Sequence, residues 1–507
     1  MSDCFPSVYS EYSLWEHGNT GHVETNGNSN SYGNILRRVS AFGGVQLFNI
    51  ATGLLRGKFV AMFLGTVGMG CNALYFSACT ALQNVTGLGL NLAIVREVSA
   101  AKSDEGRFAD VLAVVRRLIL LTAMLGAVAC FLLAPLLSRW SFGNGDYTCG
   151  FMILAVFVAL STGAAAYLSM LQGVGAVRLL TRVSVVAGLT GLLVGVPLYY
   201  FFGTGGIVPA LIAVALANFI AYYQAFRKAT QIRASRFCWK QHKGLVKGLL
   251  GLGIILAISS TLGSLVVYAV NAFVRHYGSM EDVGLFQAAN SLTSQYVGVV
   301  VSALAMDYFP RLSEVQHDND RMAQVVNRQA EVVSLITAPL CMALIATAPW
   351  VIRILLTDEY LPAVPLMRWL GLGVLLQLIQ FPLGYVYAAK GNKKVFFWLE
   401  AIWGNMVWLI CSIGFFYWLG LIGLGISLVA RNAIAFGVDL FMNSRMYGFR
   451  YSGRAWRESG VAVVLASAVF MASFREDGIG YVLMGTLLLV SCVYTFLRMR
   501  RLVGSDK

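Results

Sequence analysis

Five charged side chains stand inside the long apolar runs of this chain. Arg56, Lys58 and Arg431 are basic, and Glu400 and Asp439 are acidic. A charge near the centre of a bilayer costs ~2.5–3.5 kcal/mol on insertion scales, so such a side chain usually faces a cavity or a partner. Buried cations are suited to bind a diphosphate, whereas buried carboxylates hold a proton or a cation, or join an ion pair. These five residues are therefore the first candidates for chemistry.

The composition predicts a polytopic membrane protein. Of the 507 residues, 58% are apolar, and the mean hydropathy of +0.69 is too high for a soluble protein of this length. The net charge of +14 favours anionic lipid headgroups of the membrane as counterions, not nucleic acid. The nine cysteines show neither a CxxC motif nor a Cys/His spacing, so we expect no disulfide framework, no metal site and no cofactor.

About 14 membrane-length segments are predicted, each near the ~20 residues that a bilayer core requires. Their approximate ranges are 39–63, 71–92, 111–136, 150–171, 177–202, 206–226, 248–274, 284–306, 330–356, 363–389, 393–418, 421–444, 456–474 and 479–497. Of the 38 Lys and Arg, 30 lie in the even-numbered gaps between these segments or in the two tails, five lie in the odd-numbered gaps, and three lie inside apolar runs. Loops rich in Lys and Arg stay cytoplasmic, so both termini are expected inside.

An internal repeat relates the two halves of the chain. Five landmarks recur at offsets between 215 and 218 residues: Gly68 and Gly284, Arg96 and Arg311, Gly175 and Gly391, Gly206 and Gly423, and Arg227 and Arg445. Each unit holds six predicted helices, and this even number preserves orientation, so the axis relating the lobes runs along the membrane normal.

The repeat and the tails predict five regions. They are a disordered cytoplasmic tail at 1–34, an N-lobe of six helices at 35–228, a basic cytoplasmic linker at 229–247, a C-lobe of six helices at 248–447, and a last helix pair with a cytoplasmic tail at 448–507. We therefore expect an all-α protein with a cleft between two lobes.

The repeat also sorts the cations. An offset of 217 takes Lys58 to Arg275, so the two residues occupy equivalent places on the first helix of each lobe, whereas Arg56 corresponds to Phe273. Lys58 and Arg275 are thus a candidate pair for holding a diphosphate, with Arg56 as a further substrate contact. The alternative is that these side chains lie near the outer interface and extend to water.

The remaining candidates fall into three groups. Arg431, near mid-membrane, either contacts substrate or forms a packing ion pair with Glu400 or Asp439, and these acids are otherwise candidates for ion coupling. Arg96 and Arg311, at cytoplasmic helix ends, are candidates for an inner gate. Polar residues expected to line the cleft and meet sugar hydroxyls are Gln46, Asn49, Gln295, Tyr296, Gln377 and Gln380.

Several stretches resemble the Wzx-type flippases of the MATE-like (MOP) exporter superfamily. They are LLRGKFVAMFLGTVGMG (54–70), GLGLNLAIVREVSA (87–100), FGNGDY (142–147), EDVGLFQAANSLTSQYVG (281–298), YFPRLSEV (308–315) and GYVYAAKG (384–391). The resemblance implies a V-shaped MATE-like cleft and a carrier that turns undecaprenyl-diphosphate-linked oligosaccharide from the cytoplasmic to the periplasmic leaflet of a bacterial inner membrane. It also implies a role in O-antigen, common antigen or capsule assembly, beside a polymerase and a chain-length regulator.

Three other functions remain as alternatives. A lipid II flippase of the same superfamily would carry basic residues on the segments at 71–92 and 284–306, which hold none here. A MATE-type drug exporter would carry acids in the N-lobe cavity, but the intramembrane excess is basic. A polysaccharide polymerase or ligase would need a large outer loop or a carboxylate pair, and the outer acids are scattered on short loops.

Overall fold

The computed structural model describes residues 28–230, 235, 238–475 and 477–504, and these residues are overwhelmingly helical. The elements, in chain order, are α2 (Asn28–Gly87), α3 (Leu90–Ala101), α4 (Glu105–Phe142), α5 (Thr148–Val174), α6 (Val177–Leu193), α7 (Gly195–Phe202), η1 (Gly203–Gly206), α8 (Ile207–Ala229), α9 (Trp239–Tyr277), α10 (Met280–Glu314), α11 (Asn319–Leu355), η2 (Asp358–Ala363), α12 (Val364–Ala389), α13 (Lys393–Phe396), the π-helical segment η3 (Phe397–Trp403), α14 (Gly404–Leu419), α15 (Leu421–Tyr447), α16 (Gly453–Ala472) and α17 (Gly478–Gly504).

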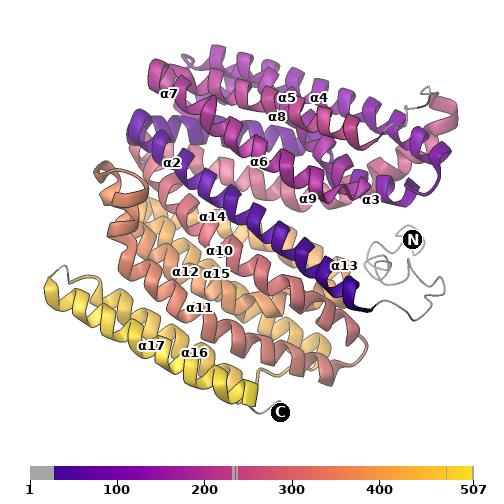
Figure 1. The fold of residues 1–507 in the computed structure, drawn as a ribbon. Coiled ribbons are helices and arrows are strands. Elements are labelled where there is room, and N and C mark those ends of the chain that lie inside the picture. Colours follow the sequence, from indigo (N-terminus) through magenta and orange to yellow (C-terminus); the bar gives the residue numbers. More distant parts are fainter. Residues whose placement is uncertain (1–27, 231–234, 236–237, 476, 505–507) are drawn as a thin grey trace.

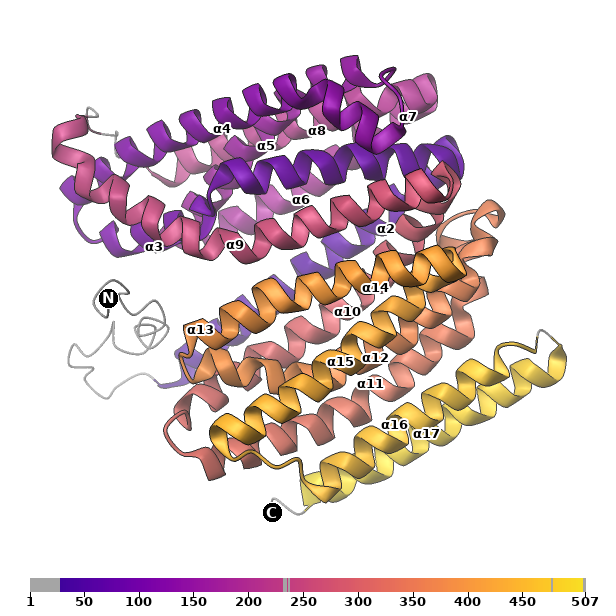
Figure 2. The same cartoon turned by 180° about the vertical axis from the view of Figure 1, so that it is seen from behind.

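The helices form two bundles, and the part of α2 before its break at Gly65 runs diagonally between them, while the part after the break lies in the first bundle (Figures 1 and 2). One bundle holds α3 to α8 with α9 beside them, and the other holds α10 to α15 with the α16–α17 hairpin on its far side. Residues 28–34 of the predicted tail are helical, because α2 begins at Asn28, while 1–27 lie outside the described residues.

Eleven described segments are long and apolar enough to cross a membrane. Two of them, 50–87 and 178–229, are 38 and 52 residues long, and each overlaps two of the predicted spans. The predicted polytopic membrane protein is confirmed, whereas the count of fourteen spans is not confirmed by these segments and stays a prediction.

The backbone repeats where the sequence repeats. Gly175 and Gly391, related by an offset of 216, end α5 and α12 in the left-handed region, with φ of 74° and 65°. Gly203 and Gly420, related by 217, end α7 and α14 with φ/ψ of 55°/−132° and 60°/−142°. Residues other than glycine rarely adopt these conformations. Equivalent glycines therefore make equivalent turns in the two halves.

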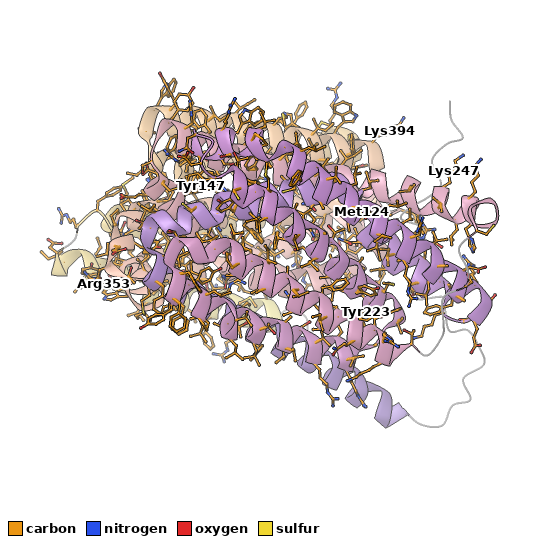
Figure 3. The ribbon with its side chains drawn as sticks, turned by 90° about the horizontal axis from the view of Figure 1, so that it is seen from above. Met124, Tyr147, Tyr223, Lys247, Arg353 and Lys394 are labelled. Atoms are coloured by element: carbon orange, nitrogen blue, oxygen red, sulfur yellow. The ribbon has the colours of Figure 1, made fainter. Side chains whose placement is uncertain are left out.

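Charge and apolar surface are arranged along the long axis of the molecule. Lys247 and Lys394 lie at one end and Arg353 at the opposite end (Figure 3). We call the end with η1 and η2 the outer end and the opposite one the inner end. Between them the outward faces expose large apolar side chains such as Met124, Ile410 and Val482. This belt is the surface that a bilayer would cover.

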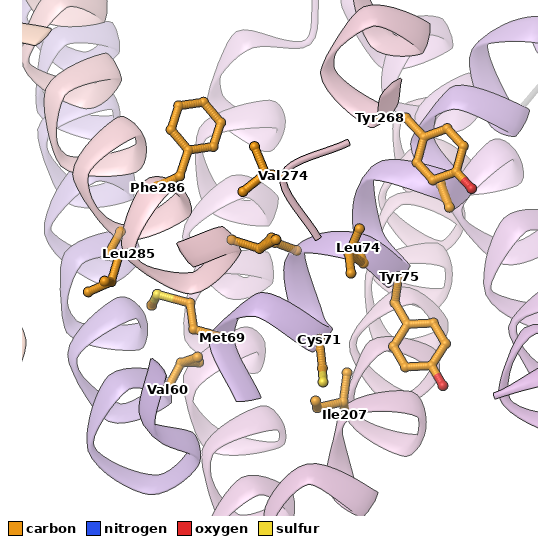
Figure 4. Close-up of a cluster of buried hydrophobic side chains, with 14 of the residues drawn as sticks. Val60, Met69, Cys71, Leu74, Tyr75, Ile207, Tyr268, Val274, Leu285 and Phe286 are labelled. Carbon is orange, nitrogen blue, oxygen red and sulfur yellow. The ribbon is translucent and has the colours of Figure 1, made fainter. Parts of the chain in front are cut away.

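Among the described residues, the hydrophobic core joins the two bundles at the outer end. One cluster there combines buried residues from both bundles, including Val60 of α2, Ile207 of α8, Val274 of α9 and Phe286 of α10 (Figure 4). Toward the inner end, one cluster joins α3, α4, α5 and α8 to α9, and a separate one lies among α10, α11 and α12. The two bundles thus meet at the outer end and have separate described clusters at the inner end.

Candidate functional site

A cavity of about 680 Å³ lies between the lobes, walled mainly by α2, α5, α8, α9 and α10. Among its described lining residues Arg56 is the one charged side chain. The Arg56 Nη1 atom lies 3.5 Å from the position that a Cβ atom would take at Gly191. Among the described residues Arg56 forms neither a hydrogen bond nor an ion pair, so its guanidinium group is available to an anionic ligand.

The same central cavity contains unused hydrogen-bond acceptors. Asn72, Asn218, Asn271 and Gln295 line it, and each has a buried side-chain oxygen without a hydrogen-bond partner in the described part of the chain. A buried polar atom left in this state costs about 1–3 kcal/mol. Hydroxyl groups of a ligand would supply the missing donors.

The structure places Lys58 and Arg275 at main-chain carbonyl groups. The Lys58 Nζ atom donates to the carbonyl oxygen of Ile354 at 2.8 Å, and the Arg275 Nη2 atom donates to that of Phe142 at 3.5 Å. The Arg275 Nε atom is buried without a partner among the described residues. No described contact joins Lys58 to Arg275, and neither is among the described residues that line the two large cavities. Their action as a diphosphate pair stays a prediction.

A second cavity, of about 520 Å³, lies within the C-lobe between α10, α12, α15 and the helix that contains η3. We call it the C-lobe cavity. It brings together Gln377, Gln380, Glu400, Arg431 and Asp439, which the sequence predicted separately as sugar, coupling and substrate residues.

The acids of the C-lobe cavity differ in their surroundings. The Gln380 Nε2 atom donates to Asp439 at 2.7 Å, and the Tyr387 hydroxyl donates to it at 3.3 Å. Glu400 accepts no hydrogen bond from the described residues, and its Oε1 atom lies 3.1 Å from the position of a Cβ atom at Gly384. Asp439 is therefore engaged, whereas Glu400 is open to the cavity.

Arg431 is held by an aromatic ring. Its guanidinium carbon lies 5.4 Å from the centre of the Trp408 ring, a cation–π distance. In the described part of the chain no ion pair joins Arg431 to Glu400 or Asp439, although Glu400 and Arg431 interact electrostatically. The charged ends of both residues thus remain available.

The other predicted residues are placed as follows. The side chains of Gln46, Asn49 and Tyr296 lie outside the described residues. Arg96 on α3 and Arg311 in the last turn of α10 are exposed at the inner end of the molecule, where their gate role stays a prediction.

Lys390 is an inner-end residue whose contacts the sequence did not indicate. At the end of α12, its amine donates to the main-chain oxygen of Gln316 and, at 2.6 Å, to the side chain of Asn319. Burial lowers the pKa of Lys390, and the carboxylate of Asp318 opposes that shift. Lys390 thereby ties α12 to the α10–α11 loop.

Sequence reasoning missed several lining residues. Asn72 and Asn271 carried the same signal as the predicted amides, a polar side chain inside an apolar segment. Tyr385 stands inside the stretch GYVYAAKG and lines the C-lobe cavity. Trp403 carried no such signal, because an aromatic residue does not stand out in an apolar segment.

Two lobes, a cleft cavity and unpaired intramembrane charges define a polytopic membrane protein with the MATE-like fold. The structure is similar to that of a lipid II flippase, MurJ, in an inward closed conformation, with a TM-score of 0.71 and 15% identity over 92% of this chain and 100% of that one. It is also similar to an inward-facing multidrug resistance MATE family transporter of the MOP superfamily, with a TM-score of 0.64 and 15% identity over 80% of this chain and 94% of that one.

The chain belongs to the polysaccharide biosynthesis protein family, whose sequence profile matches residues 59–365. It is 22% identical over 364 residues to a lipid III flippase of Escherichia coli (strain K12), covering 70% of this chain and 85% of that protein. It is 24% identical over 200 residues to the succinoglycan biosynthesis transport protein ExoT of Rhizobium meliloti (strain 1021), covering 39% of each. The predicted all-α, MATE-like fold class is confirmed, and membership of a polysaccharide biosynthesis family agrees with the resemblance found in the sequence.

Proposed function

We propose that this protein is a flippase for undecaprenyl-diphosphate-linked oligosaccharide. It moves repeat units from the cytoplasmic to the periplasmic leaflet of the bacterial inner membrane by alternating access, for assembly of a surface polysaccharide. The observation that carries the proposal is the cavity between the lobes, in which Arg56 is the one charged side chain among the described lining residues. A relative named as a flippase and another named as a transport protein in polysaccharide biosynthesis support a carrier over a polymerase or ligase.

The central cavity has groups for both parts of such a substrate. A guanidinium group binds phosphate oxygens with strong, charge-assisted hydrogen bonds, and Arg56 has no competing partner among the described residues. The buried oxygens of Asn72, Asn218, Asn271 and Gln295 accept hydrogen bonds from sugar hydroxyls. The absence of acids from the described cavity wall disfavours a cationic drug as substrate.

The remaining parts of the proposal concern orientation and coupling. Both termini and the inner end face the cytoplasm, and the outer end faces the periplasm, because the Lys- and Arg-rich loops lie at the inner end. Glu400 and Asp439 are the candidates for coupling transport to a proton or cation. A polymerase and a chain-length regulator are the expected partners, and membrane lipids surround the apolar belt.

Transport in liposomes tests the function directly. The purified protein should move a fluorescent undecaprenyl-diphosphate oligosaccharide between leaflets faster than protein-free liposomes do. Arg56→Gln should slow this movement about tenfold or more, because a hydrogen bond to a charged group is worth about 1.5–3 kcal/mol. Fluorescent lipid II, assayed in parallel, tests the closest alternative substrate.

The matched control is Arg139→Gln, which removes an exposed arginine in the last turn of α4. It should transport as the unmodified protein does. Absence of protein-dependent movement would overturn the flippase proposal, whereas full activity of Arg56→Gln would remove only the assigned role of Arg56.

A further inference from the structure

We propose that the C-lobe cavity is a saccharide subsite that binds an uncharged pyranose residue of the transported glycan. The inference rests on the proposed function and adds to it a second place of contact, separate from the diphosphate contact at Arg56. Its elements are aromatic walls, open polar groups, a volume suited to a sugar, and a glycine that leaves space for a carboxylate.

Aromatic rings line the C-lobe cavity from α10, α12 and the helix that contains η3. Phe381 and Tyr385, one turn apart on α12, hold their rings 4.6 Å apart between centres. Trp403 reaches the cavity from η3. Among the described residues its ring packs against no other aromatic ring. The apolar C–H face of a pyranose packs on the electron-rich face of such a ring. Inorganic ions bind without an aromatic ring, so the rings favour a sugar.

Polar side chains that can form hydrogen bonds stand beside these aromatic rings. Gln377, Glu400 and Arg431 line the cavity, and within the described part of the chain none of the three forms a hydrogen bond. A carboxylate accepts from two neighbouring hydroxyl groups, while the amide and the guanidinium group donate to hydroxyl or ring oxygens. Together they match the alternating donors and acceptors around a sugar ring.

The fourth polar side chain is positioned by a hydrogen bond. Because the Gln380 Nε2 atom donates to Asp439 at 2.7 Å, its Oε1 atom is left to accept from a ligand hydroxyl. Asp439 is thus a positioning residue in this subsite and Gln380 a contact.

Size and charge distinguish a sugar from other occupants. The volume of about 520 Å³ falls within the 300–1,000 Å³ of small-molecule pockets. A calcium ion needs oxygen ligands at about 2.3–2.6 Å on several sides, and no group of three His, Cys, Asp or Glu that could hold one exists among the described residues. Two carboxylates against one guanidinium group disfavour an acidic sugar.

Glu400 and Trp403 of η3 reach the same cavity because they are three residues apart, a spacing that places two side chains on one face of a helix. Gly384 of α12 leaves the space beside Glu400, since a Cβ atom there would lie 3.1 Å from the Oε1 atom. The local backbone is therefore shaped around this carboxylate.

Sugar binding by the full-length protein in nanodiscs tests the subsite. The probes are methyl hexopyranosides of gluco, galacto, manno and N-acetylgluco configuration, with methyl glucuronide as the charged counterpart. We expect saturation-transfer NMR to detect binding of at least one uncharged probe and weaker binding of the glucuronide. Glu400→Gln and Trp403→Ala should each weaken that binding about tenfold or more.

The matched controls lie outside the cavity. Trp398→Ala removes an exposed tryptophan of the same π-helical segment, and Glu281→Gln neutralises an exposed acid in the first turn of α10. Both should bind the probes as the unmodified protein does. Gly384→Ala, which displaces the Glu400 carboxylate while leaving it in the chain, gives a second variant should Glu400→Gln fold poorly.

Three results would overturn the subsite: none of the uncharged probes binds, the glucuronide binds more tightly than all of them, or Glu400→Gln and Trp403→Ala bind as the unmodified protein does. Failure of the proposed function has a different signature. If the protein binds uncharged sugars at this cavity but moves no lipid-linked oligosaccharide in liposomes, the subsite proposal stands and the flippase proposal is wrong.

Discussion

Lys58 and Arg275 occupy equivalent positions in the repeat and make equivalent contacts. Lys58, from the N-terminal repeat, donates to Ile354 near the end of α11, and Arg275, from the C-terminal repeat, donates to Phe142 at the end of α4. Helix C-termini carry unpaired carbonyl groups and partial negative charge, which favour cations. We infer that the pair closes the outer end, each residue holding a helix of the other repeat.

Replacing both cations separates closure from substrate binding. We expect the double variant Lys58→Met with Arg275→Met to slow lipid-linked oligosaccharide transport severalfold, because two charge-assisted hydrogen bonds worth about 1.5–3 kcal/mol each are lost. Its affinity for the substrate, measured in detergent, should stay unchanged, while Arg56→Gln should weaken it. Full transport by the double variant would contradict this role, and a loss of affinity would favour the diphosphate pair predicted from sequence.

The sequence predicted the equivalence of Lys58 and Arg275 but not their acceptors. Equivalence follows from a fixed offset, which is a property of the sequence. The acceptors are main-chain carbonyl groups, and every residue has one, so no residue type marks them. Glu400 and Asp439 show the same limit: both were predicted as buried acids, but only their surroundings distinguish the open one from the engaged one.

At the scale of elements, α2 contains a break that a single residue makes. Gly65 interrupts the helix with φ of 62° and ψ of −171°, a conformation that is essentially restricted to glycine. The Tyr360 hydroxyl of η2 donates to the Gly65 carbonyl oxygen at 2.8 Å, and Tyr360 is fully buried. The sequence predicted a gap at 64–70 between two spans. Which glycine breaks the helix depends on η2, which is about 295 residues away in the chain.

Substitutions at this break should differ in how far they lower the thermal stability of the protein. Gly65→Ala forces a side chain into a glycine conformation, which costs about 1–3 kcal/mol, and places a Cβ atom 3.2 Å from the Glu359 carboxylate. Tyr360→Phe removes one hydrogen bond, worth about 0.5–1.5 kcal/mol. Thermal unfolding in detergent should therefore show a larger loss of Tm for Gly65→Ala than for Tyr360→Phe. Gly437→Ala, where a Cβ atom meets nothing within 4 Å, is the control, and the reverse order would contradict the assigned strain.

At the scale of the whole molecule, the outer end is closed by a crossing of two helices without side chains between them. A Cβ atom at Gly284 of α10 would lie 2.0 Å from the carbonyl oxygen of Thr66, and one at Gly70 of α2 would lie 2.2 Å from that of Met280. Among the described residues, the core cluster shared by the two bundles lies at this end, whereas their inner clusters are separate. The predicted cleft is thus sealed outside, and transport requires this crossing to open.

Gly284→Ala should prevent complete closure of the outer end. A real Cβ atom needs about 3.0 Å from a main-chain oxygen, so the crossing must widen by about 1 Å, and the backbone of α2 cannot yield as a flexible side chain would. We expect hydrogen–deuterium exchange to rise severalfold near the crossing, in the middle of α2 and in the first turns of α10. We expect the rate of transport to fall. Exchange at the inner ends of α3 and α12 should not change, since their cores are independent. Gly414→Ala, with open space at its Cβ position, should alter neither exchange nor transport. Unchanged exchange at the outer end of Gly284→Ala would contradict a gate built on this crossing.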